Sequence, residues 1–174
     1  MSVTISITDD DVFTALGNFL VAVLPANTPV IQLQDNGVAM PTGPFVGMNN
    51  GNMKRLATNT DTYTDPVTTI GTKLMGSPSA YTMTVDLYGP DAGAWAATIQ
   101  ALFRDEFATS LFPDNIQPLY ADDPIQIPLI NGEQQWEQRW RLQAVMQTSA
   151  VVTVPQDFAA SLSVGLKEVE AEYK

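Results

Sequence analysis

Two side chains that carry much of protein chemistry are absent, because the 174 residues include neither cysteine nor histidine. Without cysteine the chain forms no disulfide and offers no thiolate as a nucleophile or metal ligand. Without histidine it lacks the commonest general base and the commonest transition-metal ligand. These absences argue against an enzyme and against a bound cofactor, so we expect no catalytic residues.

Basic residues are also scarce. Eight Lys and Arg residues stand against 19 Asp and Glu residues, which gives a formal net charge of −11 at pH 7. A surface of this sign repels the phosphates of nucleic acids at long range. We therefore expect no sequence-specific binding of DNA.

A membrane-spanning stretch is not apparent either. The apolar run Val12–Leu24 is interrupted by Thr14, Gly17 and Asn18, and it is too short and too polar to cross a bilayer. The first eleven residues carry no basic segment of the kind that opens a signal peptide. We expect a soluble protein without membrane partners, made in a reducing cytoplasm. The length, with 45% hydrophobic and 16% charged residues, predicts one globular domain over residues 1–174.

The clearest local signal is a first helix. Thr8 is a good N-cap residue, and the acidic run Asp9–Asp11 that follows favours the positive end of a helix dipole. Apolar residues then recur at steps of three and four until Pro25, which predicts a helix from Asp9 to Leu24. Capping explains this acidic run, and a turn explains Asp122–Asp123, so we expect no metal at either place.

Alternation of apolar and polar residues predicts strands. Tyr81–Tyr88 reads as a strand with one buried face, and Pro29–Gln34 and a segment from Pro44 are predicted as further strands. Gly89–Asp91 ends the strand and begins a second helix, whose apolar stripe stops before Pro113. Two helices and an antiparallel or mixed sheet make an α+β fold.

The second half of the chain predicts a hairpin. Asn131–Gly132 is a strong turn signal between an alternating segment, Ile125–Leu129, and a long returning strand, Trp136–Met146. Pro155–Phe158 predicts a turn or one short helical turn, and Leu162–Val169 predicts a final strand with one irregularity.

The returning strand places Trp136 and Trp140 on one face. They pack under the helices or, alternatively, form an exposed platform for a carbohydrate or peptide. Arg139 and Arg141 fall on the other face, toward solvent or a neighbour.

The composition changes between Met48 and Ser79, where Thr, Asn, Gly and Asp dominate. We expect a long, partly extended hairpin or loop that projects from the domain. Lys54 and Arg55 within it either sit on a solvated tip or contact an acidic neighbouring subunit. No Ser-x-x-Lys spacing, phosphate-binding loop or EF-hand loop occurs in the sequence.

Four stretches carry a resemblance to a known family: Thr8–Leu16, Asp86–Ala92, Phe112–Pro124 and Leu129–Gln135. They resemble phage neck terminator proteins, and the likeness covers most of the chain. It is weakest between Met48 and Ser79. None of these stretches is a catalytic motif.

The resemblance implies a structural virion protein of the neck or tail, with a sheet flanked by helices. Similar terminators form rings, commonly hexamers, that close the head-proximal end of the tail tube and join it to the head–tail connector. The implied partners are copies of the chain, the tail tube protein, a connector or adaptor protein and, in a contractile tail, the sheath. DNA would pass through an acidic lumen without sequence-specific binding.

We therefore expect subunit contacts from the projecting segment and from the arginine face of the returning strand. The candidate interface residues are Asn49, Asn52, Lys54, Arg55, Asn59, Tyr63, Arg139 and Arg141. The alternative is a non-catalytic module that binds carbohydrate or peptide through its tryptophans.

Overall fold

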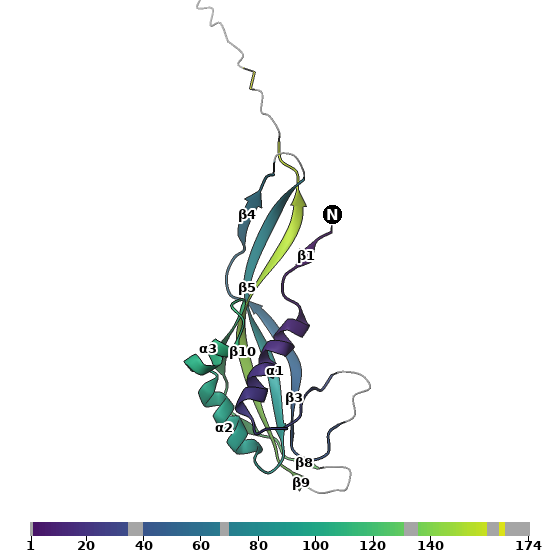
Figure 1. Cartoon of the computed structure of the whole chain (residues 1–174), viewed down its shortest axis with the longest axis vertical. Coiled ribbons are helices and arrows are strands. Elements are labelled where there is room, and N and C mark those ends of the chain that lie inside the picture. Colours follow the sequence, from purple (N-terminus) through teal and green to yellow (C-terminus); the bar gives the residue numbers. More distant parts are fainter. Residues whose placement is uncertain (1, 35–39, 67–69, 131–135, 160–163, 166–174) are drawn as a thin grey trace, which may run out of the picture.

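The computed structural model describes residues 2–34, 40–66, 70–130, 136–159 and 164–165. Within them, three helices pack on a mixed, mostly antiparallel sheet of eight strands, and two further strands form a small sheet (Figure 1). The helices are α1 (Asp9–Val23), α2 (Ala92–Leu102) and α3 (Glu106–Leu111). The strands are β1 (Thr4–Ile5), β2 (Val30–Gln32), β3 (Phe45–Arg55), β4 (Thr60–Thr64), β5 (Gly71–Tyr88), β6 (Ile116–Ala121), β7 (Ile125–Gln126), β8 (Leu129–Ile130), β9 (Trp136–Glu137) and β10 (Arg139–Gln156). The predicted α+β class is confirmed in this broad sense.

The sheet is built around one long pair of strands, β5 and β10. Each has 18 residues, and they pair antiparallel without a register shift from Gly71 opposite Gln156 to Tyr88 opposite Arg139. At about 3.4 Å per residue the pair is about 60 Å long. The sheet order is β1-β10-β5-β3-β2, with β4 also on β5 and with β6 and β7 also on β10.

Helix α1 begins at the predicted residue, Asp9, and ends one residue before the predicted end. The Asp11 N–H donates to Thr8 Oγ1 at 3.4 Å, and the Thr8 N–H donates back to Asp11 Oδ2 at 2.7 Å, which makes a capping box. The backbone hydrogen bond from Thr8 lowers the pKa of Asp11. The helix ends at Val23, with Leu24 as its C-cap, immediately before Pro25.

The prediction of a single second helix is wrong, because two helices, α2 and α3, occupy that segment. The N–H of Phe103 still bonds to Ile99 O, but Asp105 then leaves the helical conformation. Its carboxylate accepts from the Phe107 N–H at 2.9 Å and caps α3. The capping side chain of Asp105 therefore starts a new helix within a stretch whose apolar periodicity alone predicts one continuous helix.

The core lies between the helices and one face of the lower half of the sheet (Figure 1). Phe19 of α1 is fully buried, and its ring meets Phe103 at 5.3 Å and Phe112 at 5.8 Å between centroids. Seven of the predicted inward residues are buried: Tyr81, Met83, Val85, Leu87, Leu142, Ala144 and Met146. The other three are not, since Trp136 and Gln138 are exposed and Trp140 is half-buried.

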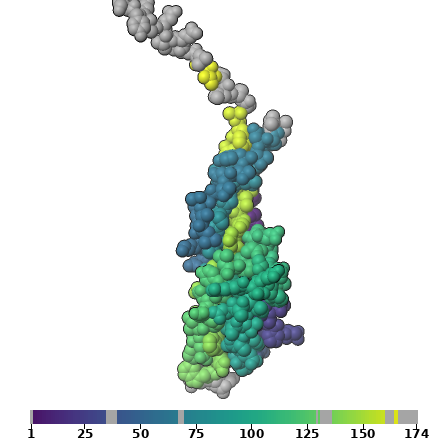
Figure 2. Space-filling view, turned by 90° about the vertical axis from the view of Figure 1, so that its left-hand side faces the viewer, coloured from purple at the N-terminus to yellow at the C-terminus, as the bar shows by residue number. Residues whose placement is uncertain are grey.

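Beyond the helices the sheet continues alone as the projecting sheet, made of β1, β4 and the adjoining ends of β5 and β10. Figure 2 shows this half as a narrow extension above the wider, helix-covered half. The segment Met48–Ser79 thus lies mostly in strands, with β3 and then β4 running along β5. Pro78 falls between the last residue that pairs with β3, Ser79, and the first that pairs with β4, Gly76, so its missing N–H breaks no ladder there.

The returning strand is longer than predicted, and the turn expected at Pro155–Phe158 is wrong at its start. β10 runs through Pro155 to Gln156. β1 pairs only with Val152 and Thr153, so within the described residues β10 is an edge strand on that side beyond Thr153. A proline is tolerated on an edge.

Two predictions fall partly or wholly outside the described residues. The turn predicted at Asn131–Gly132 lies outside them, although the flanking arms, β8 and β9, pair antiparallel as expected. Most of the final strand predicted over Leu162–Val169 does as well. In the part of the chain that is described, no helix has the length and apolar character to cross a membrane.

Candidate interaction surfaces

A buried ion cluster lies on the sheet face opposite the helices. Asp86 has no exposed side-chain surface, and the guanidinium groups of Arg139 and Arg141 grip it from β10. Arg139 donates through Nε at 3.1 Å and Nη2 at 2.8 Å, and Arg141 through Nε at 2.8 Å and Nη2 at 3.1 Å. Asn49 Nδ2 adds a fifth hydrogen bond at 3.3 Å. The carboxylate is therefore saturated by donors.

The strand register assembles this cluster. Asp86 lies directly opposite Arg141 on β10 and opposite Gly47 on β3. A Cβ on Gly47 would come within 2.4 Å of the Leu33 side chain, so the glycine lets Leu33 cover this part of the sheet. Arg139 lies 5.4 Å over the ring of Tyr88, which adds a cation–π contact.

The pKa of Asp86 reflects two opposed effects. Burial alone raises it, but the hydrogen bonds and positive charges of Arg141 and Arg139 outweigh burial and hold the pKa below its ordinary value. The same contact raises the pKa of Arg141. The ion cluster is thus charged under ordinary conditions.

Acid should weaken the fold through this cluster. Asp86 stays ionised in the folded chain below pH about 3.9, where an aspartate of the unfolded chain takes up a proton. Its contribution is therefore complete above that pH and is lost as pH falls through the lowered pKa of the folded state. We expect the urea midpoint to fall more between pH 7 and about pH 3 in the wild type than in Asp86→Asn. Equal losses in the two proteins would contradict this expectation.

The prediction that Arg139 and Arg141 face solvent or a neighbour needs correction. Both side chains engage Asp86 within the subunit, because an unpaired buried carboxylate would be costly. Their side chains keep 18% and 38% of their surface exposed. Whether that surface also contacts another subunit stays a prediction.

The remaining candidate interface residues form a second, separate group. Asn52, Lys54 and Arg55 lie on the outer half of β3, Asn59 lies in the connection to β4, and Tyr63 lies on β4. All five are exposed. The structure therefore brings Asn49, Arg139 and Arg141 together at Asp86, and it places the other five along the projecting sheet.

The two tryptophans do not share an environment. Trp140 of β10 is half-buried against α2, where a Cβ on Gly93 would come within 3.1 Å of its ring. Trp136 belongs to β9 and is 72% exposed. The strand breaks at Gln138, whose carbonyl accepts from the Gly89 N–H. Core packing is thus correct for Trp140 in part and wrong for Trp136.

Trp136 borders a groove of about 690 Å³ at the end of the sheet that lies away from the projecting half. Its walls include the stacked rings of Phe45 and Tyr88, with centroids 4.3 Å apart. The turn prolines Pro41, Pro44 and Pro90 also line it, together with Thr42, Gly43, Gly89, Glu137 and Gln138. The groove offers aromatic and proline surfaces that suit contact with another chain.

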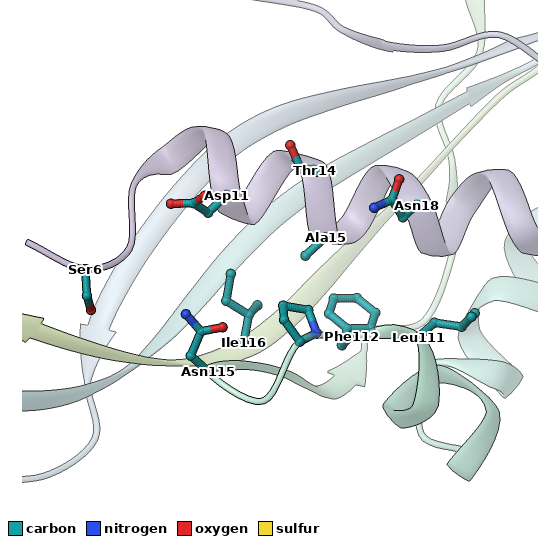
Figure 3. Close-up of a pocket in the computed structure, with 10 residues that line it drawn as sticks. Ser6, Asp11, Thr14, Ala15, Asn18, Leu111, Phe112, Asn115 and Ile116 are labelled. Atoms are coloured by element: carbon teal, nitrogen blue, oxygen red, sulfur yellow. The ribbon is translucent and has the colours of Figure 1, made fainter.

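A second pocket, of about 460 Å³, lies between α1 and the segment that joins α3 to β6 (Figure 3). Thr14, Ala15 and Asn18 of the helix line it, with Ala15 pointing toward Ile116, and Asn115 and Ile116 border it from the other side. Its carboxylate, Asp11, is already engaged by Thr8. Among the described residues no group of three or more acidic side chains is arranged to hold a metal ion.

Sequence reasoning missed Asp86, which it placed on the polar face of a strand. The ion cluster could have been found only from residues far apart in the sequence. These are one acid on β5 and two arginines, two residues apart, on the strand that pairs with it. The described residues thus present an ion cluster buried within the subunit, a projecting sheet and two pockets lined by several elements.

A model of the phage neck terminator protein family matches residues 10–170, and the chain belongs to that family. None of the curated proteins matches it. The chain is therefore a structural protein of the phage tail and a component of the virion, and its family implies contacts with other tail or head components.

Proposed function

We propose that copies of this chain form a ring that closes the head-proximal end of the tail tube and joins it to the head–tail connector. DNA passes through the centre of the ring. Six copies are expected, by the resemblance to other terminators. The partners are the tail tube protein, a connector or adaptor protein and, if the tail contracts, the sheath. The subunits are made in the host cytoplasm and end in the virion.

The observation that carries this proposal is the uncovered continuation of the core face of the sheet. Strand alternation puts Met75 and Val152 of the projecting sheet on the same face as the helix-covered Met83 and Met146. They are only half-buried, because none of the three helices described lies over this half (Figure 1). A sheet buries one face against a second layer, and here a neighbouring chain would supply it.

Exposed apolar side chains on the same face support the same proposal. Ile5 lies directly opposite Val152 and is 57% exposed, and Tyr63 is 54% exposed. Isolated exposed apolar residues need no explanation, but several on one face mark an interaction surface. The same face also holds the ion pair of Asp61 with Lys73, beside Met75 and Tyr63, so the surface is apolar with one charged pair. The ring contact is therefore expected on this face.

The charge of the chain supports a channel that does not retain DNA. At −11 per subunit, a ring lined by part of this charge repels phosphates instead of binding them. DNA would then slide through it in either direction.

The proposal is tested by purified protein alone and with tail tubes. Mass photometry should find a closed oligomer, and negative-stain electron microscopy should find rings at one end of the tubes. A protein that remains monomeric at micromolar concentration and never associates with tubes would refute the ring.

A pair of neighbouring substitutions tests which face carries the contact. Val152→Asp puts a charge on the uncovered apolar face, whereas Thr153→Asp puts it on the opposite face of the same strand. We expect Val152→Asp to abolish assembly, lowering the oligomer fraction at least tenfold, because it would bury an unpaired charge. Thr153→Asp should assemble nearly as the wild type does. Circular dichroism checks that both variants are folded, and assembly of folded Val152→Asp would contradict the assignment.

A second candidate function is supported by the exposed Trp136 alone. In this reading the chain is a non-catalytic module that binds a carbohydrate or peptide in the groove beside Trp136. Trp136→Ala should then keep the fold but lose binding on a glycan or peptide array. A wild-type protein that binds nothing on either array removes this candidate.

A further inference from the structure

The projecting sheet has two unguarded edges. β4 pairs with β5 on one side, and β1 pairs with β10 on one side, and among the described residues neither has a strand on its other side. All residues of β1 and β4 are exposed. A row of unpaired backbone N–H and C=O groups of this kind is a template for another strand.

Natural edge strands are usually protected by proline, lysine or an inward charge. The edge beside the helix-covered half is protected in this way, because Pro118 lies within β6 and Pro124 immediately precedes β7. By contrast, residues 3–6 and 58–65 contain no proline and no lysine. Asp61 of β4 is charged, but Lys73 of β5 neutralises it at 2.8 Å. Proline and lysine are thus absent from these two edges, and the remaining protection is the shortness of β1, which has two residues.

From these edges we propose that β4 of one subunit adds to β1 of the next, so that the projecting sheets join into one continuous sheet. The proposal rests on the ring stated above and names the contact that closes it. β4 runs antiparallel to β5, β5 to β10, and β10 to β1, so β4 and β1 run in opposite directions. A head-to-tail junction between them continues the antiparallel order of the sheet.

The two edges also match in the side chains they bring to each face. Thr62, Leu74, Thr153 and Thr4 lie opposite one another across the four strands and so share one face. A junction that keeps these threonines on one face puts Ile5 on the other with Tyr63. That arrangement extends the apolar band of the uncovered face from one subunit to the next, and such a pattern sets strand register.

This contact is heterologous, since each subunit gives one edge and receives the other. Repeated by rotation, it consumes every free edge of this half only when the ring closes. Pairing of β4 with β4 of a second copy would instead stop at a dimer and leave both β1 edges open.

The absence of cysteine makes the proposal directly testable. We place one cysteine at Thr4 and a second at Thr60, Thr62 or Thr64 in three double variants, all on one face of the sheet. Within one subunit β10 and β5 separate the two edges by about 14 Å, too far for a disulfide. Any disulfide between Thr4→Cys and a β4 cysteine therefore joins two subunits.

After mild oxidation of assembled protein, at least one double variant should give a non-reducing gel ladder that ends at the ring size. The single variants supply one control. Thr4→Cys combined with Thr98→Cys on the exposed side of α2 is the matched control, with equal thiol content. Neither control should give a ladder.

Three other results would overturn the junction. Dimers from Thr62→Cys alone would show that β4 pairs with β4. Wild-type rings whose double variants assemble without cross-linking would reject the β4–β1 contact and leave the ring intact. A wild-type protein that forms no ring would refute the proposed function itself, and the junction with it.

Discussion

Replacing Asp86 by Asn should lower the free energy of unfolding by about 3 kcal/mol, because it leaves Arg139 and Arg141 without their counter-charge in a part-buried site. Asn has the same shape and can still accept a hydrogen bond, so the loss reports the charge and not a cavity. The thermal midpoint should fall by on the order of 10 °C. Urea denaturation followed by circular dichroism measures the difference.

The matched control is Asp114→Asn, an exposed acid in the turn before β6. Its effect should stay within about 0.5 kcal/mol. If both substitutions have equally small effects, the charge of Asp86 adds nothing to the free energy of unfolding. That result is possible when the cost of desolvating the charges cancels their attraction.

Phe19→Ala should cost about 3–5 kcal/mol, since it removes a fully buried ring from between Phe103 and Phe112 and leaves a cavity. The variant should remain folded at low temperature, but its unfolding midpoint should lie at a much lower urea concentration.

Phe107→Ala on α3 is the control, because that ring is 43% exposed. Its cost should be under about 1 kcal/mol. Similar losses for Phe19→Ala and Phe107→Ala would mean that the helix layer does not form the core described.

The parts of the fold that the sequence predicts are those with local causes. Helix α1 is fixed by a cap at Thr8, an acidic first turn and Pro25, all within one segment. The inward face of β5 follows from simple alternation. The arms β8 and β9 pair on either side of the turn signal Asn131–Gly132 in the sequence.

The parts that the sequence does not predict depend on distant partners. Asp86 looks like a surface acid until β10 brings Arg139 and Arg141, 53 and 55 residues away, into register. Pro155 looks like a strand end because a proline is tolerated only if one side of the strand is open. Exposure of Trp136 likewise depends on the strand break at Gln138.

The candidate contact residues were predictable in kind but not in grouping. A Thr- and Asn-rich segment with two basic residues indicates an exposed element, and Asn52 to Tyr63 are exposed. That Asn49 turns inward to Asp86 is a consequence of its position opposite Thr84, close to the ion cluster. Strand pairing decides such details, and pairing is non-local.

The unbroken pairing of β5 with β10 has a mechanical consequence. The same two strands run through the helix-covered half and the projecting half, with no register shift between them. A force along the projecting half therefore loads many backbone hydrogen bonds in shear at once, and it is transmitted to the helix layer without an intervening hinge. We therefore expect the two halves of the subunit to move as one rigid body.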